Sequence, residues 1–210
     1  MIQKYYEKTL SSLTKEQEKI ELKKTISNFT NDIYERLKKA DSRTTIANNL
    51  SAFLQNGIDT AKIYADFKNR QNWYGIADKI PLLIDKGLDA CMIYNDCKAA
   101  GQWQIVLNNL PCLSDSGVKI DISALYGGLK EKNNWLDIEN NISLFLSKGV
   151  NPNMIYADLI MKENWQCLSS CLPEMMLCGL DVDMAYNDLQ KNNKWSVITA
   201  NLEYFLARGS

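Results

Sequence analysis

Residues 149–165 read GVNPNMIYADLIMKENW, and the skeleton of this stretch recurs along most of the chain. A glycine is followed by an apolar residue, by Asp or Asn, by a tyrosine and then by a tryptophan. The tryptophans stand at positions 73, 103, 135, 165 and 195, at intervals of 30, 32, 30 and 30 residues, and a tyrosine lies nine residues before each of them. This in-phase recurrence is typical of a repeat protein with a unit of about 30 residues.

Each unit carries the signals for a tight turn between two helices. Glycine suits the left-handed residue just beyond a helix end, and the apolar residue after it makes the contact that accompanies such a cap. The polar residue that follows suits the N-cap of a new helix. The glycines are Gly57, Gly87, Gly117, Gly149, Gly179 and Gly209, and the N-cap residues are Asp59, Asp89, Asp121, Asn151 and Asp181. The pattern therefore predicts a helical hairpin in every unit.

The spacing of apolar residues places both helices of a hairpin. In the first helix of the last unit, Val182, Ala185, Tyr186 and Leu189 fall on one face. The second helix begins near the tryptophan, and its apolar stripe runs through an internal position that holds proline in three units, as Pro81, Pro111 and Pro173. We expect a second helix that is bent at this position, and two separate helices are the alternative.

The pattern continues upstream in a weaker form, with Tyr34 in the tyrosine position and Arg43 in the tryptophan position. Before it, Thr14-x-x-Gln17 has the form of a capping box. This motif predicts the start of a charged helix over about residues 15–40, preceded by a short helix over residues 1–13.

We therefore expect an N-terminal helical cap over residues 1–41 and a repeat array over residues 42–210, in one continuous domain. The units of the array end near the five tryptophans. The predicted fold is an all-α, right-handed α-solenoid of helix-turn-helix repeats with an N-terminal cap.

Tandem helix pairs of this kind resemble tetratricopeptide and pentatricopeptide repeats, over about residues 30–210. The segment MAYNDLQKNNKWSVITANLEYFLARG is similar to the second family, with its early tyrosine and closing glycine. The unit is shorter than in either family, and the tryptophan and the internal proline are not family features. The resemblance implies a solenoid of helical hairpins, and pentatricopeptide arrays bind single-stranded RNA through a polar residue shortly after the tyrosine. Two residues after it, this chain has Asp66, Asp96, Gly128, Asp158 and Asp188. Since a column of carboxylates repels phosphate, this argues against RNA.

Composition narrows the function classes. Hydrophobic residues make up 46% and charged residues 23%, as in folded soluble proteins, while a net charge of −1 argues against a nucleic-acid partner. The apolar runs are too short for a membrane span or a secretory signal. The six cysteines form no CxxC pair and histidine is absent, which predicts a reduced, cytoplasmic protein without a metal or other cofactor. Without histidine the usual catalytic base is missing, so we predict that the chain is not an enzyme.

The candidate partner-binding residues lie on the first helices. Asp66, Asp96, Asp158 and Asp188 form a column roughly 110° from the centre of the core face. Flanking them are Met92, Met154, Met184, Asn95 and Asn187. The aspartates can instead contact the neighbouring repeat or form local ion pairs, Asp66 with Arg70 and Asp158 with Lys162. The methionines can instead fill the seam between hairpins. Three lysines, Lys68, Lys98 and Lys130, form a partial line that we expect to be solvated. We expect Cys167, Cys171 and Cys178 to be small buried hydrophobes.

The third unit departs from the pattern, with Gly127-Gly128 in its first helix and a two-residue insertion at Lys119-Ile120. The leading hypothesis for the whole chain is a protein–protein interaction module (a scaffold, adaptor or regulator) that binds a partner protein or peptide on the first-helix face. The alternatives are a single-stranded RNA-binding repeat protein and a bacterial secreted effector, or a regulator of one. The last rests on the abundance of Asn, Lys and Ile, and it would place the protein in a host cytosol.

Overall fold

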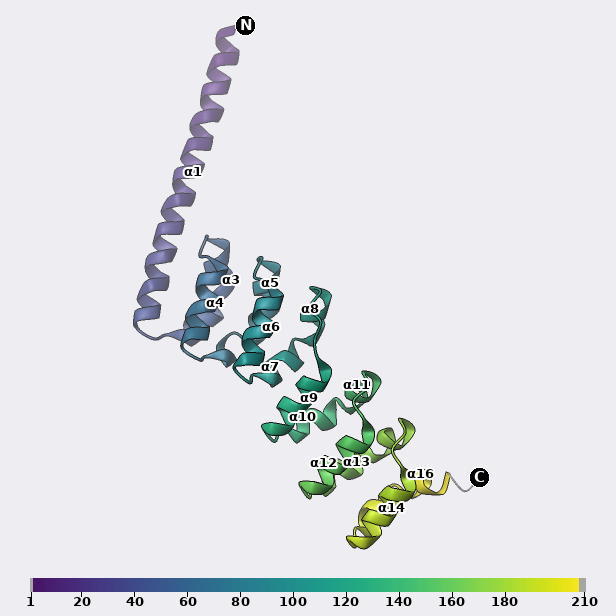
Figure 1. Cartoon of the computed structure of the whole chain (residues 1–210). Coiled ribbons are helices and arrows are strands. Elements are labelled where there is room, and N and C mark those ends of the chain that lie inside the picture. Colours follow the sequence, from purple (N-terminus) through teal and green to yellow (C-terminus); the bar gives the residue numbers. More distant parts are fainter. Residues whose placement is uncertain (1, 208–210) are drawn as a thin grey trace. The chain divides into compact units, whose positions relative to one another are not determined.

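The computed structural model describes the backbone of residues 2–207 and the side chains of residues 15–207 (Figure 1). All regular structure within residues 2–207 is helical, which confirms the predicted all-α class. The chain divides into two compact units, Met1–Val118 and Lys119–Ser210. The boundary falls directly before the Lys119-Ile120 insertion that interrupts the repeat, and we describe each unit by itself.

The first unit contains three hairpins. Its helices are α1 (Ile2–Lys39), α2 (Arg43–Asn48), α3 (Leu50–Gln55), α4 (Thr60–Asn69), η1 (Trp73–Gly75), η2 (Ala77–Lys79), α5 (Ile80–Asp85), α6 (Ala90–Ala99), α7 (Trp103–Asn108) and α8 (Leu110–Asp115). The second unit also contains three hairpins. Its helices are α9 (Ile122–Glu131), α10 (Trp135–Asn140), α11 (Ile142–Ser147), α12 (Pro152–Met161), α13 (Trp165–Leu177), α14 (Val182–Lys191), α15 (Trp195–Ala200) and α16 (Leu202–Leu206).

The N-terminal segment is one continuous helix of 38 residues, α1. The prediction of a short helix over residues 1–13 and a new helix from Thr14 is therefore wrong. A capping box marks a helix start only where the preceding chain leaves the helix, and residues 2–13 contain no glycine or proline that would end one. The expected boundary of the cap at residue 41 lies in the turn that follows α1.

The turns from one hairpin into the next form as predicted. The five glycines Gly57, Gly87, Gly117, Gly149 and Gly179 have φ between 85° and 98°. The N–H of the following apolar residue bonds back across the turn, as in Ile58 N–H to Phe53 O at 3.0 Å, which is the Schellman pattern. Each predicted N-cap side chain accepts a backbone N–H of the next helix, and the Asp59 carboxylate accepts from Ala61 at 2.8 Å. Gly209 lies outside the described residues.

The core of each unit follows the tyrosine column and the apolar stripes of both helices. Tyr34, Tyr64 and Tyr94 are buried in the first unit, and Tyr126 and Tyr156 in the second. The tryptophans are less uniform. Trp73 is buried, the next three are half-buried, and Trp195 is exposed, as is Tyr186 of the same hairpin.

The second helix of most hairpins is split into two short pieces, so the prediction of a single bent helix is wrong for them. Only α13 is continuous, although it contains Pro173. The α10/α11 pair has no proline and is split, which shows that proline is not what separates the pieces. The break falls six residues after the tryptophan position. Asparagine occupies it in four split hairpins, as Asn49, Asn109, Asn141 and Asn201, and Lys79 occupies it in the fifth.

Each of these asparagines folds its side chain back onto the helix that it ends. The Asn109 amide donates to the carbonyl of Ile105, four residues earlier, at 3.0 Å. An asparagine side chain that bonds nearby backbone competes with helix continuation, which explains the break. In α13 the same position holds Cys171 and the helix continues, whereas the hairpin with Lys79 is split, so asparagine favours the break without being required for it.

The buried asparagines also satisfy carbonyls that a proline leaves without a donor. Pro81 has no N–H to give to the carbonyl of Ala77, and Asn109 of the next hairpin donates to this carbonyl at 2.9 Å. Asn201 does the same for the carbonyl of Ser169, four residues before Pro173, at 3.2 Å. Proline in one hairpin and asparagine in the next thus form a matched pair.

Replacing Asn109 with Ala should destabilise the protein, because the part-buried Ala77 carbonyl then loses its side-chain donor. We expect a loss of about 1 to 3 kcal/mol in the free energy of unfolding, measured by urea denaturation. The matched control is Asn49→Ala, since Asn49 is exposed and donates to Thr45 of its own helix. The free energy of unfolding of Asn49→Ala should fall by less than about 0.5 kcal/mol. Equal losses in the two variants would contradict the pairing.

Candidate functional site

A three-residue contact links the first helices of neighbouring hairpins, and we call it the staple. The tyrosine of one first helix and the lysine one turn later both donate to the aspartate of the next first helix. In the first staple, Tyr34 Oη lies 2.7 Å from Asp66 Oδ2, and Lys38 Nζ lies 2.7 Å from Asp66 Oδ1. The two donors therefore occupy different oxygens of one carboxylate.

The same contact recurs in both units. In the first unit, Tyr64 Oη lies 3.1 Å and Lys68 Nζ 2.7 Å from the carboxylate of Asp96. In the second unit, Tyr126 Oη lies 2.9 Å and Lys130 Nζ 3.0 Å from Asp158 Oδ2. Each tyrosine precedes its aspartate by 32 residues and each lysine by 28, so the same spacing is used three times. In the third staple Lys130 Nζ contacts both oxygens of Asp158, the second at 3.1 Å.

Burial and hydrogen bonding shift the pKa values of the staple in opposite directions. Burial acts first on Tyr34, Tyr64 and Tyr126, and the neighbouring aspartate adds to it, so their pKa values lie well above the ordinary value for tyrosine. Burial also opposes the charged form of Asp66, but the bonds from Lys38 and Tyr34 together outweigh it and lower its pKa. The first staple therefore holds a neutral phenol and a charged carboxylate.

The last position of the column is built differently. Ile160 stands where the other staples have lysine, and Tyr156 donates to the backbone carbonyl of Ala185 at 3.2 Å. Burial, and then the charge of Asp188, raise the pKa of Tyr156. In α9, the first helix of the fourth hairpin, Gly128 stands where the other first helices that follow α1 have the aspartate, so no carboxylate is present there.

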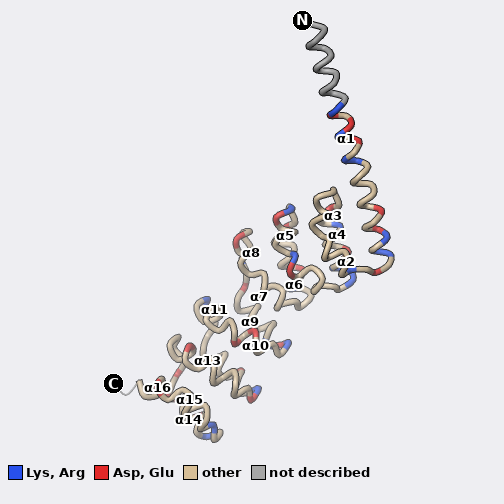
Figure 2. The backbone as a smooth tube through the Cα atoms, turned by 180° about the vertical axis from the view of Figure 1, so that it is seen from behind, with Lys and Arg blue, Asp and Glu red and all other residues tan. Residues whose placement is uncertain are grey.

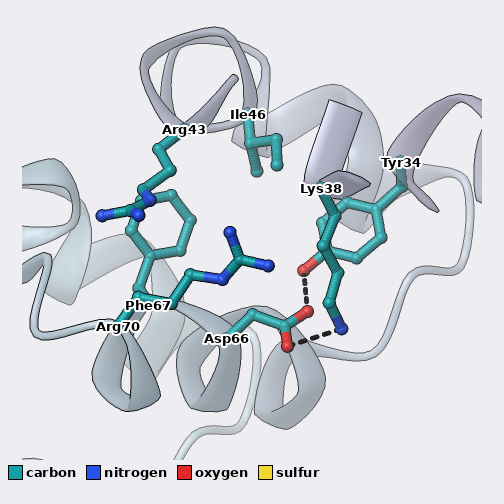
Figure 3. A pocket seen from close by; sticks show the side chains of 7 residues that line it. All are labelled: Tyr34, Lys38, Arg43, Ile46, Asp66, Phe67 and Arg70. Atoms are coloured by element: carbon teal, nitrogen blue, oxygen red, sulfur yellow. Dashed lines mark hydrogen bonds and ion pairs between the residues drawn. The ribbon is translucent and has the colours of Figure 1, made fainter. Parts of the chain in front are cut away.

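The first staple borders a small pocket, shown in Figure 3, where Tyr34 and Lys38 both reach Asp66 from α1. Beside it, Arg43 clasps Asp41 through two nitrogens, at 2.7 and 2.9 Å, and Arg70 joins the same carboxylate at 2.6 Å. The hydrogen bond from Arg43 is the main reason why the pKa of Asp41 is lowered. The cavity volume is about 10 Å³, room for one water molecule, so the arginines largely fill the site.

The equivalent place one hairpin later is an open hollow of about 520 Å³. It is lined by Lys68, Gln71, Trp73, Asp96, Ala99, Ala100 and Gln102. Trp73 takes the position of Arg43, and Ala100 takes the position of Arg70. The hollow is open because a methyl group replaces a long guanidinium side chain.

The small residues at the hollow are a departure from the repeat. Among the first helices that follow α1, the others have longer side chains at the same three positions, whereas α1 itself has Lys39-Ala40-Asp41. The longer ones are Asn69-Arg70-Gln71, Glu131-Lys132-Asn133, Met161-Lys162-Glu163 and Lys191-Asn192-Asn193, against Ala99-Ala100-Gly101 here. The small residues at the end of α6 therefore leave room for a side chain of another molecule in this hollow.

The predicted partner-binding residues fall into two groups. Asp66, Asp96 and Asp158 are held in staples, and Asp188 is half-buried beside Tyr156. The remaining ones lie nearer the solvent. Met92, Met154, Asn95 and Asn187 are exposed, and Met184 is half-buried.

Two expectations about charges are wrong. Asp66 bonds to Tyr34 and Lys38, and Arg70 pairs with Asp41. The local ion pair between Asp66 and Arg70 is therefore not formed. Asp158 likewise pairs with Lys130. The lysine line that we expected to be solvated supplies the staple cations at Lys68 and Lys130. Because each staple neutralises its carboxylate, the expected repulsion of phosphate is correspondingly weaker.

The cysteines are thiols, and two of them meet inside α13. Cys167 and Cys171 are buried with their sulfurs 3.9 Å apart, whereas Cys178 is exposed, contrary to expectation. The hydrogen bond with Cys167, followed by burial, raises the pKa of Cys171, so this thiol is held neutral and packs as a small apolar group. Within the described residues, no three or more Cys, Asp or Glu side chains gather as a metal site would require. No helix in the described part of the chain is both long and apolar enough to cross a membrane.

Removing the carboxylate of a complete staple should cost more than removing one without a lysine. For Asp158→Asn we expect a loss of about 1.5 to 3 kcal/mol in the free energy of unfolding, because Lys130 and Tyr126 lose a charged acceptor. Asp188→Asn is the control, with an expected loss below about 1 kcal/mol. A double-mutant cycle of Lys130→Met with Asp158→Asn measures the coupling between the two side chains. Additive effects in this cycle would contradict the staple.

Stability should fall at high pH as the buried tyrosines ionise. Their folded-state pKa values lie above about 10, the unfolded value, so their contribution is intact below about pH 10 and is lost as the pH rises beyond it. We expect a steep decrease in Tm between about pH 10 and 11.5, with the tyrosinate absorbance of the buried tyrosines appearing only as the protein unfolds. In Tyr64→Phe, which has one phenol fewer to ionise, the decrease should be smaller. Tyrosinate absorbance that rises fully before unfolding would refute the prediction.

No protein-family model matches the chain, and the comparisons with curated proteins and with solved structures found no similar protein. The function of this site is therefore argued from its own residues.

Proposed function

We propose that the chain is a protein–protein interaction module, a right-handed α-solenoid with an N-terminal cap that binds a partner protein or peptide on the face of its first helices. The observation that carries the proposal is the hollow at Ala100. Its volume of about 520 Å³ lies in the range of pockets that accept a ligand or an anchoring side chain. A peptide can place one such side chain there while the rest of it lies along α6.

The walls of the hollow suit a side chain with an apolar body and a polar end. Trp73, Ala99 and Ala100 supply apolar surface, and Gln71 and Gln102 supply amide donors and acceptors. Aromatic and aliphatic anchors that enter pockets of this kind dominate the energy of many interfaces.

The exposed residues of α6 extend the surface beyond the hollow. Met92 lies one helical turn before Asp96 and is 37% exposed, and Asn95 is exposed beside it. A flexible thioether adapts to the shape of a partner, and an asparagine amide can bond to its backbone. These residues belong to the set predicted from the sequence to bind a partner.

The charges at the hollow favour a protein partner over RNA. Its two charged side chains, Lys68 and Asp96, neutralise each other at 2.7 Å, which leaves no excess of positive charge for phosphate. Single-stranded RNA is the alternative partner, and the same affinity purification tests it.

The test fills the hollow with the side chain that fills the equivalent pocket. Ala100→Arg copies Arg70 into an exposed position at the end of α6, so it should fold normally. Tagged wild type and Ala100→Arg are used for affinity purification from the native cell, with quantitative mass spectrometry. We expect one or more proteins to be enriched by the wild type and reduced at least about tenfold by the variant, which corresponds to about 1.4 kcal/mol of binding free energy.

The matched control is Asn192→Arg, which places the same side chain at the same position of the last hairpin. It should leave the recovered proteins unchanged. Equal recovery with Ala100→Arg and wild type would reject the hollow as the binding site. Recovery of RNA alone, with an affinity that falls as salt rises, would instead favour the RNA-binding alternative.

A further inference from the structure

The N-terminal helix has an apolar stripe that the rest of its unit does not cover. Leu22, Ile26, Phe29 and Ile33 follow one another at spacings of four, three and four residues. Leu22 is 61% and Phe29 65% exposed, while Tyr34 on the face toward α4 is buried. Figure 1 shows that α1 continues well beyond the ends of α3 and α4, so its N-terminal part has no neighbouring helix in this unit.

This spacing is that of a coiled-coil seam. Apolar residues that alternate by three and four positions have a period of about 3.5 residues, which keeps one seam facing a partner helix. In heptad terms Ile26 and Ile33 take position a, and Leu22 and Phe29 take position d. Isoleucine at a with leucine at d is the combination that favours two parallel strands.

The charges that flank the seam fit a second copy of the same helix. In a parallel pair, position g of one helix meets position e of the following heptad on the other, five residues later in the sequence. Glu18 at g therefore meets Lys23 of the second copy, and Thr25 meets Thr30 of the second copy. The first pair is attractive, and the second is uncharged. Figure 2 shows acidic and basic residues interspersed along this part of α1.

We propose that the chain forms a parallel homodimer through α1, with Leu22, Ile26, Phe29 and Ile33 as the seam. The seam is short, because Lys19 takes the next a position upstream and Arg36 takes the next d position downstream. Ile33, at its inner end, is half-buried against its own unit. The dimer is therefore weak and depends on concentration, and it brings two copies of the array together side by side at their N-termini.

The first test uses sedimentation equilibrium of the full chain over a range of concentrations. We expect a monomer–dimer equilibrium and, in Ile26→Ser, a dissociation constant at least about tenfold higher. The control is Ile20→Ser. Ile20 is 59% exposed and has the same chemistry, but it lies two residues from Leu22, roughly 200° around the helix and off the seam. It should change the constant less than about twofold.

The second test determines the orientation of the helices. Glu18→Lys and Lys23→Glu should each weaken the dimer, because each creates a like-charge pair, and the double variant should restore it. An antiparallel dimer would not show this restoration, and neither would binding to an unrelated helix. Far-UV circular dichroism confirms that every variant keeps its helices. A wild-type chain that stays monomeric at all concentrations, equal effects of Ile20→Ser and Ile26→Ser, or a double variant without recovery would each overturn the proposal.

Discussion

The hydroxyl of a buried tyrosine needs an acceptor, and in three hairpins of this chain the acceptor is an aspartate of the next hairpin. This requirement shapes much of the structure, because each first helix after α1 has only ten residues. Helices of that length are marginal in isolation and depend on tertiary packing. The tyrosine ring supplies the packing, and its hydroxyl fixes the register. With lysine on the other carboxylate oxygen, two neighbouring helices cannot slide past each other without breaking two charge-assisted contacts.

A second constraint couples the identity of one residue to that of another in the next hairpin. Pro81 is followed 28 residues later by Asn109, and Pro173 is followed at the same interval by Asn201. Where the proline position holds serine, the later residue is not asparagine. Ser51 is followed by Lys79, and Ser143 by Cys171. Since the amide is needed where a carbonyl lacks its donor, a hairpin of this protein is matched to its neighbour. Hairpins exchanged between positions would lose this match.

Signals that act within a few residues could be predicted from the sequence. The glycine turns and the Asp and Asn caps form where the repeat places them, because each depends on backbone geometry next to the residue concerned. The continuous α1 and the position of the breaks in the second helices were harder to predict. Thr14-x-x-Gln17 has the form of a helix start, but no helix breaker precedes it. For the second helices the alternative of two separate pieces is correct in five hairpins, and the break lies two residues before the proline position.

The staples illustrate why the site was harder to predict than the fold. Asp66 and Lys38 are 28 residues apart, and only the packing of one helix on the next brings them within 2.7 Å. A signal was present, since lysine follows the tyrosine by four residues at Lys38, Lys68 and Lys130 and the aspartate follows the next tyrosine by two. Comparing the lysine of each repeat with the aspartate of the following repeat pairs these residues correctly. Because a lysine on a helix is usually solvated, the spacing of these lysines alone did not predict a contact with the next hairpin.

In a repeat protein, residues that recur in every unit and residues that break the pattern have different uses. In three hairpins the tyrosine, lysine and aspartate columns are engaged in contacts between hairpins, so these residues cannot by themselves distinguish one partner from another. A specific binding surface requires a feature that occurs once. Ala99-Ala100-Gly101 is such a feature among the first helices that follow α1, because the others have longer side chains at these positions and the neighbouring pocket is filled by Arg70. Recognition then depends on the departure from the repeat, while the repeat itself supplies the rigid helices that hold the departure in place.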